Sequence, residues 1–347
     1  MGYCMVHKKI AVSLVLAFLF NILLSQIAFA SDEQEIYHSL LDGKRVLKQR
    51  DYMEEETPTV YLTFDDGPSY LTESILEILK EENVKATFFV LGQSAGRYKE
   101  TLKKMVEEGH SIGNHTFSHD YNKLYNSFSS FWEEIQKTEE MIYDITGIRT
   151  SLVRTPGGTY QNWDSFYFYY MDQADYLIYD WNVDSGDSRR RGVTKEEILS
   201  SIKKSKLGHR LVVLLHDGSG HENTVKALTE IINYYKAKGY QFKPLTNQVE
   251  PVLHASTPIR WNRLSEFDLR AHFTRKTPGK ELAERLFVKK MNKVDERIIY
   301  QSGSTLSAAE PQTQEKAKKT FYLSKEWIFY KMSKTLFTIP FLIYNKI

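Results

Sequence analysis

Strand-like and helix-like segments alternate through about 190 residues of this chain, and the alternation limits the folds open to it. Apolar runs such as TVYLTF (59–64) and RLVVLLHDG (210–218) are separated by segments with helical spacing, such as 128–145. Strands that are apolar on both sides are typical of parallel sheets covered by helices on both faces. The sequence therefore predicts an α/β fold of parallel strands, and several such strands favour a closed or nearly closed barrel.

Side chains capable of acid–base or metal chemistry gather directly after these strands. In an α/β barrel the carboxyl ends of the strands form one face, and active sites lie on that face. We therefore expect residues far apart in the sequence to meet there. They are Asp65 and Asp66, His115 and His119, Arg154, Asp184 and Asp187, and His216 and Asp217.

Two of these groups suggest a metal site. HTFSH places His115 and His119 four residues apart, which on a helical turn puts both imidazoles on one face. TFDDGPS adds Asp65 and Asp66 at a strand end. Two histidines and one carboxylate commonly bind a catalytic divalent metal, and a second carboxylate can then take a proton from water. By themselves, DDGP is also typical of a solvated turn and HxxxH of a surface pair.

Five segments, TFDDGPS, HTFSH, RTPGG, DWNVDSGD and LLHDG, occur in this order. In order and spacing they resemble the five motifs of the polysaccharide deacetylases, the NodB-homology group or carbohydrate esterase family four. The resemblance covers roughly residues 58–247. It implies a distorted (β/α) barrel and metal-dependent N- or O-deacetylation of chitin, peptidoglycan glycans, related amino-sugar polymers or acetylated xylan. We expect an N-deacetylase, which hydrolyses non-peptide carbon–nitrogen bonds.

The resemblance also implies which residues bind the metal. Asp66, His115 and His119 would be its ligands, and Asp65 would be the general base, braced by Arg154. The metal would be one divalent ion, zinc first, although cobalt, nickel or manganese accept the same nitrogen and oxygen ligands.

For the other matched positions the resemblance implies roles in the chemical step. His216 would be the general acid, and Asp187 would orient or charge-balance His216 and Arg154. The backbone N–H of Gly157 would stabilise the oxyanion, and Leu214 would line the pocket for the acetyl methyl group.

The sequence departs from the family pattern in two places. Gly157 stands where the family often has an aromatic residue, and Ser188 stands where the fourth motif often has tryptophan. Asp184 is an alternative to Asp187 for the fourth-motif carboxylate. These departures affect the shape of the acetyl pocket and the choice of substrate, whereas the metal ligands and the base are intact.

The first residues are typical of a secretory signal peptide. Two lysines precede an apolar run at 10–24, and residues 28–30 form an A-x-A cleavage site. We expect residues 1–30 to be removed; the alternative is an uncleaved membrane anchor, because the run is long for a signal peptide. The only cysteine, Cys4, lies in this segment, so the mature chain has no disulfide and no cysteine ligand.

Charge is unevenly distributed along the rest of the chain. Residues 251–347 carry 18 Lys and Arg against 9 Asp and Glu, whereas the preceding part is acidic. We expect an exposed linker at 31–57, the deacetylase domain at 58–247 and a basic, mostly helical region of unassigned fold at 248–347. The basic region suggests contact with a wall polymer or a membrane surface; the alternative is a helical subdomain packed on the barrel.

Together these features predict an exported deacetylase acting on N-acetylglucosamine units of cell-wall glycan, peptidoglycan first. It is expected to be secreted or bound at a bacterial cell surface, to act as a monomer and to have no nucleic-acid partner. The alternatives are a chitin-oligomer or acetyl-xylan deacetylase, or a catalytically weak protein that binds wall glycan.

Overall fold

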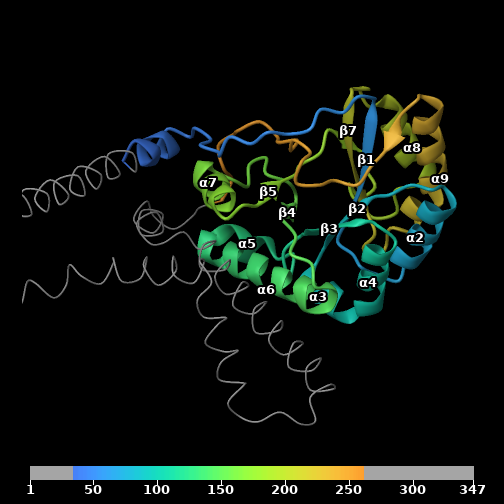
Figure 1. Ribbon diagram of the computed structural model, residues 1–347, viewed down its shortest axis with the longest axis horizontal. Coiled ribbons are helices and arrows are strands. Elements are labelled where there is room, and N and C mark those ends of the chain that lie inside the picture. Colours follow the sequence, from blue (N-terminus) through green and yellow to red (C-terminus); the bar gives the residue numbers. More distant parts are fainter. Residues whose placement is uncertain (1–33, 262–347) are drawn as a thin grey trace, which may run out of the picture. The chain divides into compact units, whose positions relative to one another are not determined.

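The computed structural model describes residues 34–261 (Figure 1). The leader and most of the basic C-terminal region lie outside the described residues. The strands are β1 (Thr59–Asp65), β2 (Thr87–Val90), β3 (Ser111–Asn114), β4 (Leu152–Val153), β5 (Leu177–Ile178), β6 (Val183–Asp184), β7 (Arg210–His216) and β8 (Gln241–Phe242). The helices are α2 (Thr72–Glu81), α3 (Gly92–Arg97), α4 (Lys99–Glu107), α5 (Tyr121–Asn126), α6 (Phe128–Thr146), α7 (Ser165–Gln173), α8 (Lys195–Lys204) and α9 (Glu222–Ala237).

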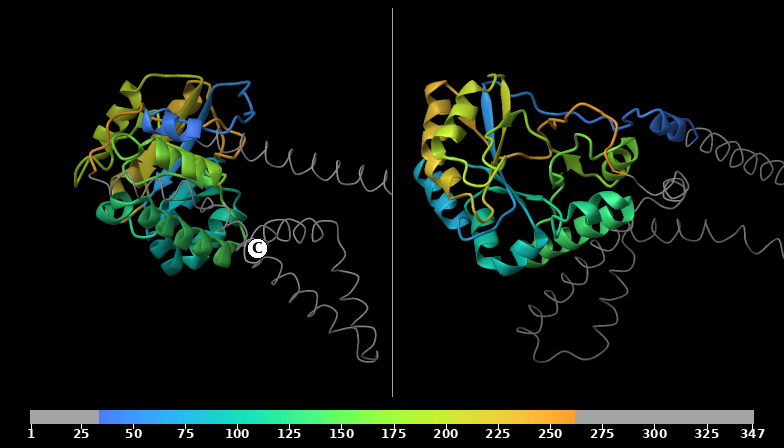
Figure 2. Two further views of the ribbon diagram at one scale, coloured as in Figure 1. Left: turned by 90° about the vertical axis from the view of Figure 1, so that its left-hand side faces the viewer. Right: turned by 180° about the vertical axis from the view of Figure 1, so that it is seen from behind.

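The strands form one parallel sheet in the order β5-β4-β3-β2-β1-β7-β6, and β8 pairs with the start of β1. Helices α2, α4, α8 and α9 cover the outer side of its central strands (Figures 1 and 2). Among the described residues the outermost strands β5 and β6 do not pair with each other, so the barrel is curled but open. This confirms the predicted distorted barrel of parallel strands.

The segment DYLIYDWNV, which reads as one strand, instead forms β5 and β6 at opposite edges of the sheet. Residues 179–182 connect them. The Tyr179 N–H donates to the Val153 carbonyl beside β5, and the Asn182 N–H donates to the Val212 carbonyl of β7. The connection therefore bridges the open side of the barrel, which a local pattern of apolar residues cannot reveal.

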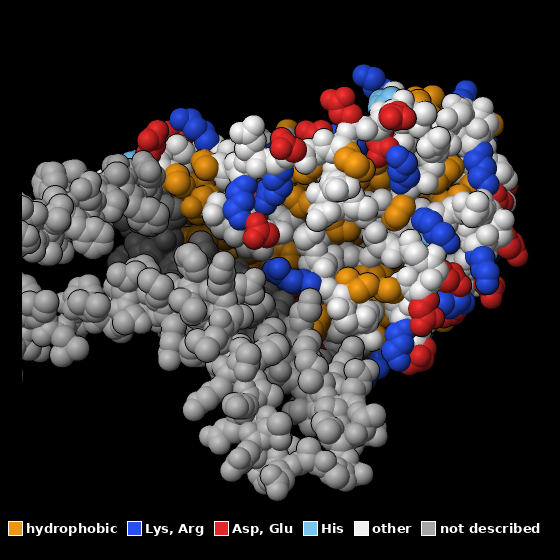
Figure 3. Space-filling model, in the orientation of Figure 1, with side chains coloured by type: hydrophobic (Ala, Val, Ile, Leu, Met, Phe, Trp, Pro, Cys, Tyr) orange, Lys and Arg blue, Asp and Glu red, His pale blue; other side chains and the backbone are white. Residues whose placement is uncertain are grey.

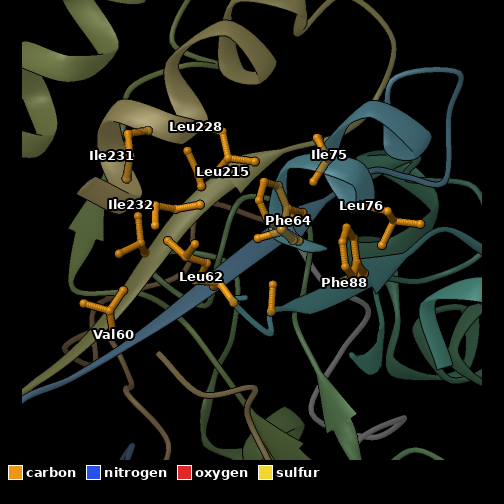
Figure 4. Packing of buried hydrophobic residues seen from close by; sticks show 14 of the residues in the cluster. Val60, Leu62, Phe64, Ile75, Leu76, Phe88, Leu215, Leu228, Ile231 and Ile232 are labelled. Atoms are coloured by element: carbon orange, nitrogen blue, oxygen red, sulfur yellow. The ribbon is translucent and has the colours of Figure 1, made fainter. Parts of the chain in front are cut away.

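Side chains of the central strands alternate between two faces, as the period of two in a strand requires. On β1 the outward set packs against α2 and α9 in the main hydrophobic core (Figure 4). That set is Val60, Leu62 and Phe64. The inward set begins with Tyr61 and Thr63 and ends with Asp65, which is buried at the strand end.

The segment before β1, expected as an exposed linker at 31–57, has mostly exposed or half-buried side chains over its described residues but also contacts the barrel. Residues 34–41 are helical, and their side chains Tyr37 and Leu40 are buried. Further along, the Lys48 N–H donates to Asp172 of α7 at 2.8 Å. The segment is thus held by tertiary contacts, which its charged composition does not show.

The segment after β8 also stays on the barrel, beyond residue 247 where the domain was expected to end. The Tyr179 hydroxyl donates to the Val249 carbonyl, and the Asp180 carboxylate accepts from the His254 N–H at 2.8 Å. The packed unit therefore extends at least to Trp261.

The face shown in Figure 3 carries Lys and Arg interspersed with Asp and Glu over the described residues. Among residues 34–261 we find no helix with the length and apolar content that crossing a membrane requires.

Candidate active site

Four strand ends meet at one edge of the barrel. The register pairs Asp65, the last residue of β1, with His216, the last residue of β7. Asn114 ends β3 and pairs with Val153, which ends β4. His115 and Arg154 follow these two strands directly, so the structure brings together side chains from four separate segments, as the position of the motifs predicted.

Asp66, His115 and His119 converge on one point. Asp66 Oδ1 lies 3.4 Å from His115 Nε2 and 3.3 Å from His119 Nε2. One ligand atom from each residue lies within 4.8 Å of the other two. Asp66 has a φ of 75°, so the chain turns sharply as it leaves β1. This turn directs the carboxylates of Asp65 and Asp66 to different partners.

The three donors fit a divalent cation. Asp66 Oδ1 is buried and accepts no hydrogen bond within the described part of the chain. His115 Nδ1 lies 2.8 Å from the Arg154 carbonyl oxygen, an arrangement that leaves Nε2 as the ligand atom. Although burial raises the pKa of Asp66, the nearby histidines lower it below its usual range. Two imidazoles and one carboxylate are a common donor set of catalytic metal sites.

The HTFSH segment is a loop, and the helical turn suggested by its spacing is wrong. Residues 115–120 have no helical structure, and His119 has a φ of 61°. The buried Glu134 of α6 accepts hydrogen bonds from the N–H and the hydroxyl of Ser118 at 2.6 and 2.8 Å. A distant carboxylate therefore holds His119 beside His115.

Arg154 holds Asp65 from inside the barrel. The guanidinium is fully buried, and Nη1 donates to Asp65 Oδ1 at 2.9 Å and to Thr63 Oγ1 at 2.6 Å. Its remaining nitrogens donate to the carbonyls of Tyr179 and Asp180 at 3.0 and 3.1 Å. These bonds offset the cost of burying the ion pair. The other Asp65 oxygen, Oδ2, lies on the side of the metal ligands.

His216 and Asp187 form a second buried pair. Asp187 Oδ1 lies 2.7 Å from His216 Nδ1, and Oδ2 accepts from the His216 N–H at 2.9 Å and from the Thr224 hydroxyl at 2.8 Å. Burial lowers the pKa of His216, but the attraction and hydrogen bond of Asp187 outweigh it and raise the pKa to about 9. The His216 imidazole is therefore protonated over the neutral pH range.

Of the two candidates for the fourth-motif carboxylate, Asp187 contacts His216 and Asp184 does not. Asp184 is exposed, and its Oδ1 accepts from the Gly186 N–H. The hydrogen bonds of Asp187 go to His216 and Thr224, while Asp65 pairs with the Arg154 guanidinium. The expected charge-balancing of Arg154 by Asp187 stays a prediction.

Gly67 and Asp217 explain why the turn after the two aspartates needs a glycine. A Cβ built on Gly67 would lie 2.0 Å from Asp217 Oδ2, so a side chain at position 67 would displace the Asp217 carboxyl. Asp217 is fully buried, accepts from the Thr72 hydroxyl at 2.6 Å, and has a pKa raised to about 7 by burial. The Asp217 carboxyl thus packs directly against the turn at Gly67.

Gly157 lies in the loop after β4, and Leu214 lies on β7. Gly157 has a φ of 71°, and its N–H donates to no acceptor among the described residues. Leu214 is buried on β7 and shares the interior face with His216, two residues later. Their roles toward the oxyanion and the acetyl methyl group stay predictions.

His221 was missed by the sequence reasoning. Its ring stacks on that of His216, with centroids 5.0 Å apart and an interplanar angle of 17°. It also borders a cavity of about 350 Å³ that is lined in part by Asp187, Arg190 and Arg191. His221 matches no motif, and only the return of the loop before α9 brings it to the site.

A Gly-x-Ser-x-Gly pattern, GHSIG, occurs at 109–113 but lies away from this site. Ser111 is the first residue of β3, whereas a nucleophilic serine of that pattern follows a strand at its carboxyl end. His110 is buried in the core beside Phe88, and burial lowers its pKa to about 4. The pattern is therefore structural.

Comparisons with known proteins show which family the chain resembles. Residues 53–165 match the polysaccharide deacetylase family. The YheN protein of Bacillus subtilis, assigned to the polysaccharide deacetylases, is 37% identical over 198 residues, which are 56% of this chain and 69% of that protein. A peptidoglycan-N-acetylglucosamine deacetylase of Bacillus cereus is 34% identical over 194 residues, 55% of this chain and 68% of that protein.

The fold is similar to that of a solved relative, the catalytic domain of a peptidoglycan N-acetylglucosamine deacetylase from Eubacterium rectale. The TM-score is 0.55 at 30% identity, and the match covers 60% of this chain and 98% of that one. By sequence, fold and the residues at the strand ends, the chain belongs to the polysaccharide deacetylase family, carbohydrate esterase family four, whose members are hydrolases that cleave the acetamide C–N bond.

Proposed function

We propose that this protein is an exported, metal-dependent deacetylase that hydrolyses the acetamide of N-acetylglucosamine units in peptidoglycan. One observation carries the proposal: the Asp66–His115–His119 cluster meets two buried pairs at one barrel edge. The pairs are Asp65–Arg154 and His216–Asp187. These groups correspond to the cation site, the base and the acid that amide hydrolysis needs.

Asp66, His115 and His119 would hold the divalent cation, zinc first, since two imidazoles and a carboxylate suit it. When bound, such a cation polarises the acetamide carbonyl and makes water at the site more acidic. The Gly157 N–H, which has no acceptor among the described residues, would donate to the carbonyl oxygen as it becomes negative.

Asp65 would be the base. Its Oδ1 is engaged by Arg154, so Oδ2 accepts the proton of the attacking water as the water oxygen bonds to the acetyl carbon. Arg154 thereby fixes the orientation of the carboxylate.

His216 would be the acid. Because Asp187 holds Nδ1, the proton that leaves is the one on Nε2, and it passes to the amine nitrogen as the C–N bond breaks. The products are acetate and a glucosamine unit with a free amine.

The substrate and the location rest on supporting observations. The relatives from Bacillus cereus and Eubacterium rectale are named as deacetylases of peptidoglycan N-acetylglucosamine. That polymer lies outside the cell membrane, which agrees with a signal peptide at 1–30. The basic C-terminal region would add contact with anionic wall polymer. Mass spectrometry of digested peptidoglycan would identify which sugar loses its acetyl group.

Removing the metal is expected to abolish activity. Dialysis against a chelator should stop acetate release from peptidoglycan, and zinc or another divalent ion should restore it. The reason is that Asp66 Oδ1 has no hydrogen-bond donor among the described residues that could take the place of the cation. Enzymatic acetate assay with metal analysis measures both. Full activity in a metal-free sample would contradict the proposal.

Removing Asp187 is expected to move the pH dependence. His216 must be protonated to act, and its raised pKa keeps it so until the pH rises through that value. In Asp187→Asn the attraction that raises the pKa is lost, so kcat should fall at a pH lower by about one unit or more. The exposed Asp184→Asn is the matched control and should leave the profile unchanged. A profile insensitive to Asp187→Asn would argue against His216 as the acid.

A further inference from the structure

A row of aromatic rings leads away from the metal ligands. The ring of Tyr121, the first residue of α5, meets the His119 ring edge-on with centroids 5.3 Å apart. Trp261 lies on Tyr121 at 6.4 Å with an interplanar angle of 29°, and also contacts Tyr125 at 5.2 Å. Tyr121 and Trp261 are both half-buried, so each keeps some exposed surface.

Tyr121 takes the space beside Gly157. A Cβ built on Gly157 would lie 2.7 Å from the Tyr121 hydroxyl oxygen, so a side chain at position 157 and this placement of Tyr121 exclude each other. The glycine that departs from the family pattern is thus matched by an aromatic ring from another element. That ring borders both the metal ligand His119 and Gly157.

Arg260 and Trp261, which follow the barrel, are hydrogen-bonded to the loop that contains Gly157. Trp261 Nε1 and Arg260 Nε donate to Asn162 Oδ1 at 2.8 and 3.1 Å. Asn162 is buried, and its amide donates to the Gly158 carbonyl at 2.8 Å. One asparagine therefore couples the position of Trp261 to the RTPGG loop.

Arg260 adds hydrogen-bond donors beside the rings. Its guanidinium carbon lies 5.3 Å from the Trp261 ring centre and 5.9 Å from that of Tyr121. The residue is exposed, and its hydrogen bonds within the described residues use only Nε and the backbone N–H. The two Nη groups are free to bind a polar ligand at the edge of the aromatic surface.

We propose that Tyr121, Arg260 and Trp261 form a glycan subsite that holds a pyranose ring next to the unit being deacetylated. A pyranose offers an apolar C–H face to an aromatic ring and hydroxyl or acetamide oxygens to a neighbouring guanidinium. Because Trp261 lies beyond Tyr121 in the row from His119, it contacts the neighbouring sugar rather than the reacting one. The inference rests on the proposed function, since it names a subsite of the same substrate.

The test compares binding of penta-N-acetylchitopentaose and of N-acetylglucosamine to the metal-loaded protein carrying Asp65→Asn, which slows turnover. Adding Trp261→Ala is expected to weaken pentasaccharide binding about tenfold and to leave monosaccharide binding unchanged. Trp261→Phe keeps a ring but loses the Nε1 bond to Asn162, so it is expected to stay within about threefold of the parent. Isothermal titration gives the constants, and thermal unfolding checks that each variant is folded.

Three results would overturn the subsite: no pentasaccharide binding by the parent, equal losses for both ligands, or Trp261→Phe as damaging as Trp261→Ala. The last would make Trp261 an anchor for the loop. With Asp65 intact, Trp261→Ala should raise KM for the pentasaccharide and leave kcat unchanged. If the pentasaccharide binds through Trp261 but no acetate is released, the proposed activity fails while the subsite stands.

Discussion

An Asp65→Asn variant is expected to release acetate about 10²–10⁴-fold more slowly than the parent protein, the range that general-base catalysis supplies. Asparagine has the same shape as aspartate but cannot take the proton from water. Because Asp65 makes its hydrogen bond to Arg154 and is not the shared partner of the two histidines, bound metal should stay near one per chain. Acetate assay and metal analysis on the same sample measure the two quantities.

The matched control is the neighbouring residue. Asp66→Asn removes the charged oxygen that faces both His115 and His119, so the metal content should fall together with activity. If Asp65→Asn lost its metal and Asp66→Asn kept it, the assignment of the two carboxylates would be reversed.

An Arg154→Met variant is expected to lower the free energy of unfolding by about 3–5 kcal/mol and to abolish activity. Methionine fills much of the space but leaves the buried Asp65 carboxylate without its countercharge, and the carbonyls of Tyr179 and Asp180 without their donors. Urea unfolding followed by circular dichroism gives the stability difference.

Two comparisons isolate the effect of the buried charge. Arg189, whose side chain is 47% exposed, pairs with Glu197 at the surface. Arg189→Met should lower the free energy of unfolding by about 1 kcal/mol or less. Combining Arg154→Met with Asp65→Asn should recover part of the lost stability, because the uncompensated charge is then removed. A double variant no more stable than Arg154→Met would show that the loss comes from packing and carbonyl contacts alone.

Much of the fold was predictable because its strands and helices carry strong local patterns. The long helix α6 occurs where the helical spacing at 128–145 predicted it, and it is followed by Gly147, whose φ of 73° suits glycine. The strand β1 and its partner β7 are continuous apolar runs, and both occur where expected. The segment 175–183 was misread because its two halves pair with opposite edges of the sheet.

The candidate site was predictable in composition but not in geometry. The position of the motifs after strands indicated which side chains would meet. It could not indicate that Glu134 accepts a hydrogen bond from the loop that carries His119. Nor could it indicate that Asp187 pairs with His216 while Arg154 pairs with Asp65. Those contacts join residues with no common sequence pattern.

By itself, the sequence determined the parallel α/β class and the chemistry of the strand ends, because apolar periodicity and residue type are local properties. Only the tertiary structure decided which carboxylate faces the histidines, that His221 stacks on His216, and that Tyr121 meets His119 and Trp261. The physical reason is that these placements depend on contacts between distant segments. The left-handed conformation of Asp66 directs its carboxylate, and the hydrogen bond to Asn162 fixes the position of Trp261.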